Sequence, residues 1–191
     1  MKKILILAGP SGVGKTTLAH ALLHSTERFE LVRSVTTRAP RGDAYDAEYI
    51  YLSRDEMQRL IADGGVLEHT EYAGNLYGTP RSEIDRISAE GRTPLLILDL
   101  NGVKELKESD IAPYICAICI TAPLSVLEER LRARYGGDTE KLNLRLVQNK
   151  RDISEFEKMR DSFCYYVENS GNVEECAEEI AKHFYDFSSR A

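Results

Sequence analysis

The sequence predicts an α/β fold in which a mostly parallel β-sheet is flanked by helices. Apolar runs of strand length alternate along the chain with segments of helical character, and this alternation is typical of β–α–β units. The runs at 3–8, 94–100 and 114–120 are largely apolar, as expected of strands that are covered on both faces. A chain of 191 residues has the length of one domain and is long enough to bury a core.

Shorter elements follow the first apolar run. A helix is expected at about 14–24, and further strands are predicted at 31–37, 49–52, 66–72 and 76–78. Ser53 and Glu56 form a capping box that begins a helix ending near Gly64. Thr79 and Pro80 predict the N-cap and the first residue of another helix, which ends near Gly91. These short strands and long loops predict a small lobe inserted into the parallel sheet.

The last third of the chain is predominantly helical. Helical character extends from about 123 to 162, with a break at Gly136-Gly137. A final strand at 165–167 and a helix at about 173–187 complete the chain. We find no internal repeat and no linker, so the sequence predicts a single domain over 1–191.

Composition and charge exclude several classes of protein. Apolar residues make up 42% of the chain and charged residues 29%, which is typical of a globular protein and not of a disordered or collagen-like one. No apolar run approaches the ~20 residues that span a bilayer, and the run at 4–8 is too short for a signal peptide. We therefore expect a cytoplasmic protein with no membrane partner. The net charge of −6 also disfavours nucleic acid as a partner.

The four cysteines are interpreted as structural. Cys116 and Cys119 form a C-x-x-C pair, but they lie inside an apolar strand-like run, where cysteine acts as a small apolar residue. Cys164 and Cys176 are not a second pair at zinc-finger spacing.

A phosphate-binding loop follows the first predicted strand. Residues Gly9-Pro-Ser-Gly-Val-Gly-Lys15-Thr16 match G-x-x-x-x-G-K-[ST] at every fixed position, between a strand and a helix as the motif requires. The glycines let successive backbone N–H groups point at an anion, and the helix N-terminus adds a positive dipole end. Lys15 can reach the β/γ-phosphates, and the Thr16 hydroxyl can ligate Mg²⁺. The motif predicts a nucleoside triphosphate site with Mg²⁺ as cofactor.

A second anionic site is predicted downstream. The segment 33–41 holds Arg33, Arg38 and Arg41 and no acidic residue, in a chain of net negative charge. The planar guanidinium of arginine suits bidentate contacts to phosphate.

These segments belong to a set of motifs that resembles the guanylate kinase family. The set comprises Gly9-Pro-Ser-Gly-Val-Gly-Lys-Thr16, Ser34-Val-Thr-Thr-Arg38 with Pro40-Arg41, Tyr49, Leu67-Glu68, Gly74-Asn-Leu-Tyr-Gly-Thr79, Leu98-Asp-Leu-Asn-Gly102, Arg130-Leu-Arg-Ala-Arg134 and Asn143-Leu-Arg145-Leu. The motifs occur in the family's order and with nearly its spacing over about 3–185. Several are particular to this family, so the combination is more specific than the phosphate-binding loop alone.

The resemblance implies transfer of a phosphoryl group from ATP to GMP, giving ADP and GDP. It implies a P-loop core at about 1–32, 93–125 and 163–191, a GMP-binding lobe at about 33–92 and a helical lid at about 126–162. The implied ATP site comprises Gly9, Pro10, Ser11, Gly12, Val13, Gly14, Lys15, Thr16, Thr17, Arg130, Arg134 and Asn169. The implied GMP site comprises Arg38, Arg41, Tyr49 and Tyr77 around the phosphate, Ser34, Glu68, Thr79 and Asp99 around the guanine, and Arg145.

The chemistry of guanine agrees with this assignment. Guanine presents two adjacent donors, and a carboxylate such as Glu68 accepts both, whereas adenine would face it with an acceptor. A site built from paired polar groups can reject the wrong ligand by ~10⁴-fold, because that ligand leaves buried groups unpaired.

The predicted lid is strongly basic. Residues 130–151 hold seven Lys and Arg against Asp138 and Glu140, and Arg130 and Arg134 share one helix face. Phosphoryl transfer requires mainly positioning and charge stabilisation, and the phosphate of GMP, with a second pKa of about 6, is already a nucleophilic anion. No general base is needed. We expect the catalytic cations to be Lys15, Arg38, Arg134 and Arg145.

The sequence departs from the family pattern at three places. Ile97 stands where the family usually has an acidic residue, the loop between Arg41 and Tyr49 is one residue shorter, and the lid reads Arg134-Tyr-Gly-Gly-Asp-Thr139. Two alternatives therefore stay open: a catalytically weak binding or scaffold module, and a kinase for another phosphorylated small molecule. Retention of Lys15, Arg134 and Arg145 argues against the first, and Glu68 and Thr79 argue against the second. Acceptance of deoxy-GMP and the oligomeric state are left open.

Overall fold

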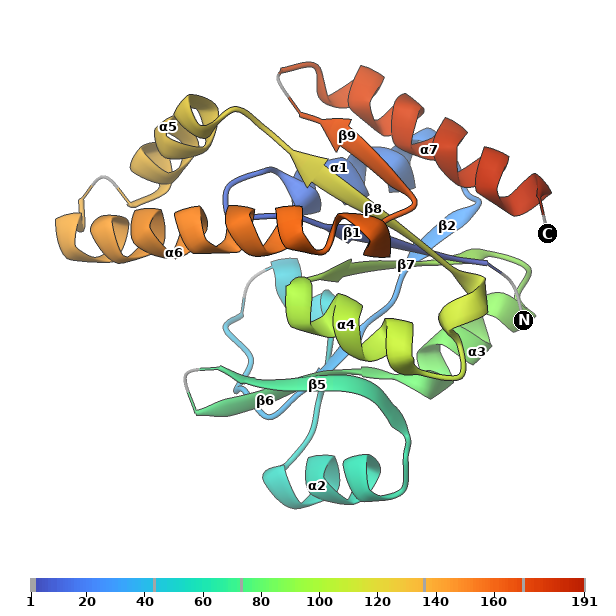
Figure 1. The fold of residues 1–191 in the computed structure, drawn as a ribbon. Helices are drawn as coiled ribbons and strands as arrows, with labels where there is room; N and C mark the ends of the chain where they lie inside the picture. The colour runs from blue at the N-terminus through green and yellow to red at the C-terminus, as the bar shows by residue number, and fades with distance from the viewer. Residues whose placement is uncertain (1–2, 43, 73, 136, 170, 191) are drawn as a thin grey trace.

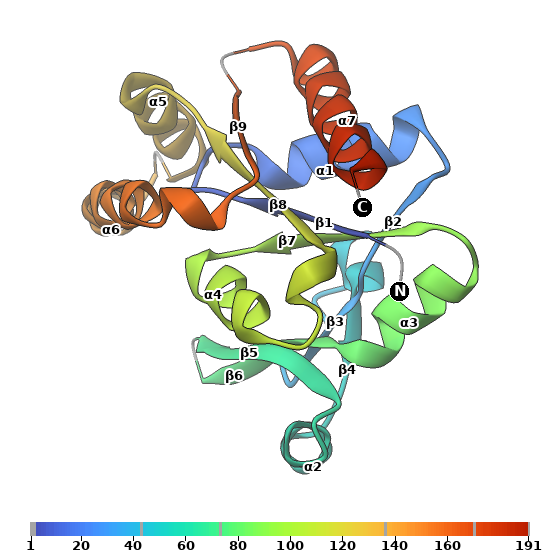
Figure 2. The same cartoon turned by 45° about the vertical axis from the view of Figure 1, so that its right-hand side comes forward.

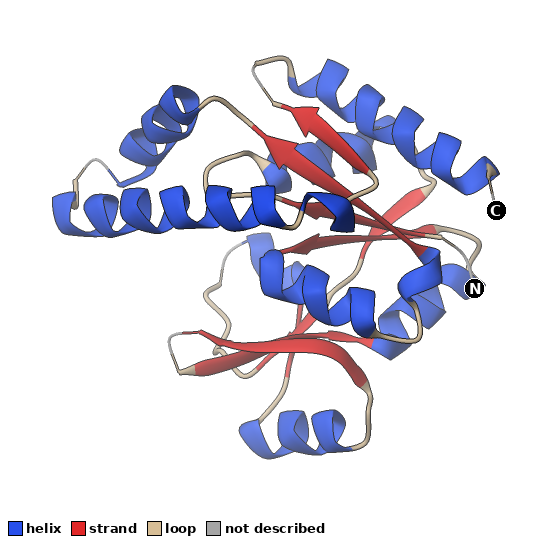
Figure 3. Ribbon diagram, viewed as in Figure 1, coloured by secondary structure: helices blue, strands red, loops and turns tan. Residues whose placement is uncertain are grey.

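The computed structural model describes residues 3–42, 44–72, 74–135, 137–169 and 171–190. Its larger sheet has the strand order β2-β7-β1-β8-β9, and every pairing in it is parallel. The strands are β2 (Phe29–Leu31), β7 (Thr93–Leu98), β1 (Ile4–Ala8), β8 (Ile115–Thr121) and β9 (Tyr165–Glu168). The predicted α/β class with a parallel sheet is therefore confirmed (Figure 3).

Helices cover both faces of this sheet, which explains why its strands are apolar throughout. Along β1, Leu5 and Leu7 point into a core formed with α1 (Lys15–Ser25) and α7 (Val173–Ser189). The alternate residues Ile4 and Ile6 point into a second core on the opposite face, formed with α3 (Arg81–Ala89) and α4 (Leu100–Glu108). Figure 1 shows α1 and α7 above the sheet and α3 and α4 below it.

A smaller mixed sheet lies beyond α3 and α4, in the order β4-β3-β6-β5. Its strands are β4 (Tyr49–Tyr51), β3 (Ser34–Thr36), β6 (Asn75–Pro80) and β5 (Val66–Tyr72), and α2 (Arg54–Ala62) packs on it. Figure 2 shows α4 between the two sheets and α2 at the far end of the molecule. The hydrophobic cluster of this part has Val35, Met57 and Leu76 as its buried residues and is much smaller than either core of the larger sheet.

Two helices follow β8 and extend to one side of the larger sheet (Figure 1). They are α5 (Leu124–Tyr135) and α6 (Thr139–Lys158), the segment predicted as a lid. Asp138 caps α6 by accepting a hydrogen bond from the backbone N–H of Lys141. The predicted break falls between the two helices at Gly137, and Gly136 lies outside the described residues. Short 3₁₀ turns occur at Ala44–Glu48, Ala112–Tyr114 and Arg160–Ser162.

Three predicted elements are wrong in detail. The strand expected at 31–37 is two strands in different sheets: the Val32 N–H still donates to Leu95 of β7, whereas the Thr37 N–H donates to Leu76 of β6. The chain therefore passes from one sheet to the other near Arg33. Both parts of the segment have strand character, so the apolar pattern does not mark the crossing.

The other two errors concern helix N-termini. The strand predicted to reach residue 100 ends at Leu98, and Asp99 caps the unpredicted helix α4 by accepting from the Gly102 N–H at 2.9 Å. Thr79 is not an N-cap: it belongs to β6, Pro80 is the cap residue, and the Thr79 hydroxyl donates to Glu68 instead. In contrast, the capping box of Ser53 and Glu56 is present as predicted.

The four cysteines are unpaired, and Cys116 and Cys119 are buried in β8. Within the described part of the chain, no helix combines the length and the apolar composition needed to cross a membrane.

Candidate active site

The phosphate-binding loop connects β1 to α1, and its backbone demands glycine at two positions. Gly9 has a φ of 152°, and a Cβ atom there would lie 2.3 Å from the carbonyl oxygen of Ile120. Gly14 has a φ of 97°, in the left-handed region, and forms the N-cap of α1. Lys15 curls back over this loop, with Nζ donating to the carbonyls of Gly9 at 2.7 Å and Pro10 at 3.3 Å. Burial lowers the pKa of Lys15 to about 8.

A cavity of about 430 Å³ opens beside this loop. Most of the residues predicted for the ATP site line it together: Ser11, Gly12, Gly14, Lys15, Thr16, Thr17, Arg130, Arg134 and Asn169. Val13 instead packs in the core with its carbonyl directed outward, and Pro10 lines a different hollow. The Val13 carbonyl accepts from Arg130 at 3.1 Å and from the Asn169 side chain at 2.8 Å, so these two residues also hold the loop in shape.

A second cavity, of about 560 Å³, adjoins the first. Its lining residues are Thr16, Arg38, Arg41, Glu48, Tyr49, Tyr77 and Arg134. All four residues predicted to hold the GMP phosphate are thus together, and Thr16 and Arg134 line both cavities. Three arginines face one acid, Glu48, whose carboxylate lies 3.1 Å from Nε2 of His20 on α1. This excess of positive charge makes the cavity a candidate anion site next to the phosphate-binding loop.

Asp46 and Tyr51, which the sequence did not single out, organise this cavity. The Asp46 carboxylate accepts from the backbone N–H groups of Arg41 and Gly42 at 2.9 and 2.7 Å and from the Arg38 guanidinium at 3.4 Å. The Tyr51 hydroxyl donates to Asp46 and accepts from Arg38 at 3.3 Å. The bond from Tyr51, with those from the backbone, lowers the pKa of Asp46 to about 2. No sequence motif marks these contacts, because they join the loop at 38–42, the 3₁₀ turn that holds Asp46 and strand β4.

Arg33 does not belong to this anion site. Its guanidinium donates two hydrogen bonds of 2.9 Å to the carboxylate of Glu83 on α3. The bonds from Arg33 and Arg86 lower the pKa of Glu83 to about 2, so Arg33 is committed to a structural ion pair. Of the three arginines at 33–41, Arg38 and Arg41 line the second cavity and Arg33 does not.

Two of the predicted guanine-recognition residues, Glu68 and Thr79, lie on β5 and β6. The Thr79 hydroxyl donates to Glu68 Oε1 at 2.6 Å, and both side chains are buried. Gly102 at the start of α4 lies so close that a Cβ there would be 3.3 Å from Glu68 Oε2. Burial, with Asp99 and Glu105 nearby, raises the pKa of Glu68 to about 7 against the opposing Thr79 bond. Ser34 lies on β3, in register with Tyr49.

A third cavity, of about 570 Å³, completes the group. It is lined by Lys15 and Ser11 of the loop, by Asp99, and by Arg145 of α6. Arg145 is held there by Tyr72 at the end of β5, whose hydroxyl accepts from the guanidinium at 2.7 Å. All four predicted catalytic cations therefore line cavities that meet at the phosphate-binding loop.

The donor groups around the loop suit a magnesium ion bound mainly through phosphate. No group of three or more His, Cys, Asp or Glu residues converges on a metal position among the residues that the structure describes. Thr16 is exposed at the edge shared by two cavities. Mg²⁺ commonly takes few protein ligands and completes its octahedron with substrate phosphates and water, so this arrangement fits it.

Comparisons with known proteins agree with this geometry. The sequence model of the guanylate kinase family matches residues 1–186. A guanylate kinase of Sus scrofa is 41% identical over 152 residues, covering 78% of this chain and 76% of the relative. A guanylate kinase of Bacillus subtilis is 35% identical over 181 residues, covering 93% of this chain and 85% of the relative.

Solved structures extend the similarity to three dimensions. A guanylate kinase from Anaplasma phagocytophilum superposes with a TM-score of 0.70 at 30% identity, over 97% of this chain and 85% of the other. A gluconokinase from Sinorhizobium meliloti, 17% identical with a TM-score of 0.53, shares the fold alone. The family match spans both sheets and the helices α5 and α6, which confirms the resemblance seen in the motifs. This chain therefore belongs to the guanylate kinase family.

Proposed function

We propose that this chain transfers the γ-phosphoryl group of ATP to GMP, releasing ADP and GDP. The observation that supports this most directly is the pair of adjoining cavities that share Thr16 and Arg134. One surrounds a loop suited to a nucleoside triphosphate, and the other is an arginine-rich anion site. The γ-phosphate of ATP in one cavity and the phosphate of GMP in the other would lie next to one another, as direct phosphoryl transfer requires.

The residues divide between the two nucleotides. Residues Gly9–Thr17 (with Arg130, Arg134 and Asn169) bind ATP. Arg38, Arg41, Tyr49 and Tyr77 bind the GMP phosphate, with Ser34, Glu68, Thr79 and Asp99 at the guanine. Residues 33–92 serve as the GMP lobe and 126–162 as the lid. Ile97 stands where the family usually has an acid. It lies on β7, packs in the core with α1 and α7, and takes no part in binding or catalysis in this proposal.

Catalysis in this proposal is electrostatic. Lys15, Arg38, Arg134 and Arg145 neutralise the charge that spreads over the transferring group, and the GMP phosphate attacks without a general base. The Thr16 hydroxyl would help to hold Mg²⁺ beside the phosphates of ATP, and the ion would supply further charge neutralisation there. The unpaired cysteines suit a reducing compartment, and we place the reaction in the cytoplasm. Nothing in the site favours the scaffold alternative.

The test is ADP release from Mg·ATP with GMP, AMP, UMP or no acceptor. We expect turnover with GMP alone. Lys15→Ala should lower kcat/KM by ~10²–10³-fold, because it removes a cation that acts on the transferred group. Glu68→Gln should raise the KM for GMP strongly, because an amide cannot accept from both guanine donors.

The matched control is Glu71→Gln, an exposed carboxylate on the same strand as Glu68. It should leave both KM values unchanged. If GMP binds with wild-type affinity but no ADP forms, the kinase proposal fails and the binding-module alternative stands.

A further inference from the structure

Lid helix α6 contacts the phosphate-binding loop through a buried polar side chain. Asn149 is 1% exposed, and its amide Nδ2 donates to the backbone carbonyl of Ser11 at 3.0 Å. The other buried residues of this helix are Leu142 and Phe156, one on each side at seven-residue spacing. Asn149 is thus a polar residue in an otherwise apolar stripe, and it points at the loop.

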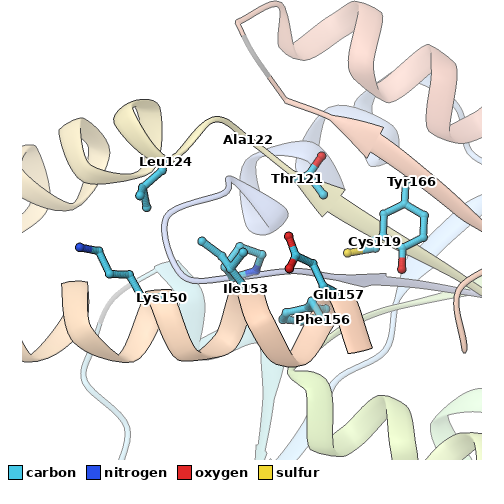
Figure 4. A pocket seen from close by; sticks show the side chains of 10 residues that line it. Cys119, Thr121, Ala122, Leu124, Lys150, Ile153, Phe156, Glu157 and Tyr166 are labelled. Carbon is cyan, nitrogen blue, oxygen red and sulfur yellow. The ribbon is translucent and has the colours of Figure 1, made fainter. Parts of the chain in front are cut away.

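Hollows flank this contact on both sides. The cavity of about 570 Å³ lies on one side, lined by Ser11 and by Gln148 and Asp152 of α6. A separate cavity of about 390 Å³ lies on the other, between α6 and the ends of β8 and β9. Figure 4 shows Lys150, Ile153, Phe156 and Glu157 of α6 facing Cys119, Thr121 and Tyr166 across it. Between these two cavities, the hydrogen bond from Asn149 joins the helix to the loop.

The contact fixes the direction of a peptide group in the loop. In a trans peptide the C=O and the following N–H point in opposite directions. The Ser11 carbonyl is drawn toward α6, so the N–H of Gly12 is turned away from α6. Gly12 lines the ATP cavity, where such an N–H can bind phosphate.

Stability alone does not account for an asparagine here. Its Oδ1 atom is buried and finds no hydrogen-bond partner among the described residues. An apolar side chain of similar size would avoid that unpaired acceptor and would continue the apolar stripe. The feature that such a replacement would lose is the Nδ2 donor to Ser11.

We propose that Asn149 is a positioning residue, which orients the Ser11–Gly12 peptide toward the ATP phosphates and ties the lid helix to the loop. Arg145 lies one turn before Asn149 on the same face of α6, so the tie also fixes the cation that reaches the reacting phosphates. The inference rests on the proposed assignment of ATP to this loop.

The test compares Asn149→Leu with the wild type. Calorimetry with Mg·ATP in the absence of GMP should show Kd increased by about fivefold to tenfold, the value of one lost hydrogen bond. The KM for GMP should stay within about twofold, and the melting temperature should not fall, because the unpaired Oδ1 is removed as well. Asn149→Asp keeps the shape but lacks the donor and should weaken ATP binding at least as much.

The control is Leu142→Ala, a truncation in the same buried stripe, seven residues before Asn149. It should lower the melting temperature and weaken ATP binding no more than GMP binding. Wild-type ATP affinity in both Asn149 variants would overturn the inference, and so would an equal loss of ATP and GMP affinity. Lys15→Ala distinguishes a wrong role for Asn149 from a wrong assignment of ATP to this loop. If Lys15→Ala still binds ATP with wild-type affinity, the assignment of ATP to the loop is wrong.

Discussion

Burial of Glu68 makes its carboxylate form, which the proposed guanine recognition needs, costly to the stability of the fold. Its pKa is about 7 in the folded protein, against an ordinary value of 4.5, because burial disfavours the carboxylate. Between these two pH values the folded protein binds a proton that the unfolded chain does not. The free energy of unfolding therefore falls as pH rises from about 4.5 to 7, and the full cost is present above pH 7.

We expect Glu68→Gln to be more stable than the wild type at pH 8. Glutamine has no charge to desolvate and can still accept a hydrogen bond from Thr79. The free energy of unfolding should therefore increase by up to about 3 kcal/mol, which corresponds to the difference between the folded and unfolded pKa values of Glu68. Near pH 4.5 the gain should vanish. Urea unfolding at both pH values measures this, with Glu71→Gln as the exposed control. A gain of equal size at both pH values would show that the carboxylate charge is not its cause.

Tyr51 aims Arg38 at the proposed GMP phosphate. We expect Tyr51→Phe to raise the KM for GMP by about threefold to tenfold with the KM for ATP unchanged, because one hydrogen bond to the guanidinium is lost. The pKa of Asp46, now about 2, should rise as well, since the Tyr51 hydroxyl is the main group that lowers it. Steady-state kinetics and NMR titration of Asp46 measure the two effects. Tyr185→Phe, remote on α7, is the control, and an unchanged KM for GMP would refute this role.

At the scale of elements, the proposed lid contacts the proposed GMP lobe through side chains of α6 and β5. Arg145 donates to the hydroxyl of Tyr72 at 2.7 Å, and its guanidinium lies 5.9 Å from the centre of the Tyr72 ring. Tyr72 is 57% exposed, so this contact adds little to stability. Its consequence is to keep Arg145 at the mouth of the cavity that Lys15 and Asp99 also line.

We expect Tyr72→Phe to lower kcat about threefold, because the ring contact remains but the hydrogen bond that orients Arg145 is lost. The free energy of unfolding should change by less than about 0.5 kcal/mol, as is usual at exposed sites. Tyr72→Leu removes the ring contact as well and should lower kcat further. Rapid-quench and steady-state assays measure these changes. Equal kcat in all three proteins would mean that the contact does not position Arg145.

At the scale of the whole molecule, the two sheets have cores of very different size. The larger sheet is packed on both faces, whereas the smaller one depends on Val35, Met57 and Leu76. The proposed GMP-binding residues on β3, β4, β5 and β6 therefore lie in the part with less buried apolar surface. Such a part can open locally while the rest of the fold stays intact.

We expect Met57→Ala to uncouple binding of the two substrates. Met57 is fully buried, so truncation should destabilise the lobe by about 2–5 kcal/mol. Hydrogen exchange should then accelerate over 34–80 but not in β1 or β8, and GMP affinity should fall while ATP affinity is kept. Leu22→Ala, in the core between the larger sheet and α1, is the matched control and should accelerate exchange across that sheet. Uniform acceleration in Met57→Ala would show that the two parts unfold as one unit.

The sequence by itself determined the parallel sheet, the phosphate-binding loop and the family. Buried parallel strands need unbroken apolar runs, and an anion cradle needs glycines at fixed spacing, so both leave local patterns. It also named Lys15, Thr16, Arg38, Arg134 and Arg145, which line the three cavities, but not other lining residues such as Glu48, Tyr72 and Asp152. Helix α4 was missed because its first residue, Leu100, directly follows an apolar strand and extends the apolar run. The later residues Val103 and Leu106 lie at helical spacing and face the sheet core. The apolar run therefore hid the start of the helix at Asp99.

Only the tertiary structure decided which charges serve the site and which serve the fold. Arg33 and Arg38 look alike in the sequence, yet one is paired with Glu83 on α3 and the other points into the anion cavity. Tyr51 and Asn149 lie in no motif, and their partners are 5 and 138 residues away. The pKa of Glu68 likewise depends on burial between a lobe and a helix that meet only in the folded chain. Pairings of this kind depend on distance in space, which a periodic pattern along one segment does not record.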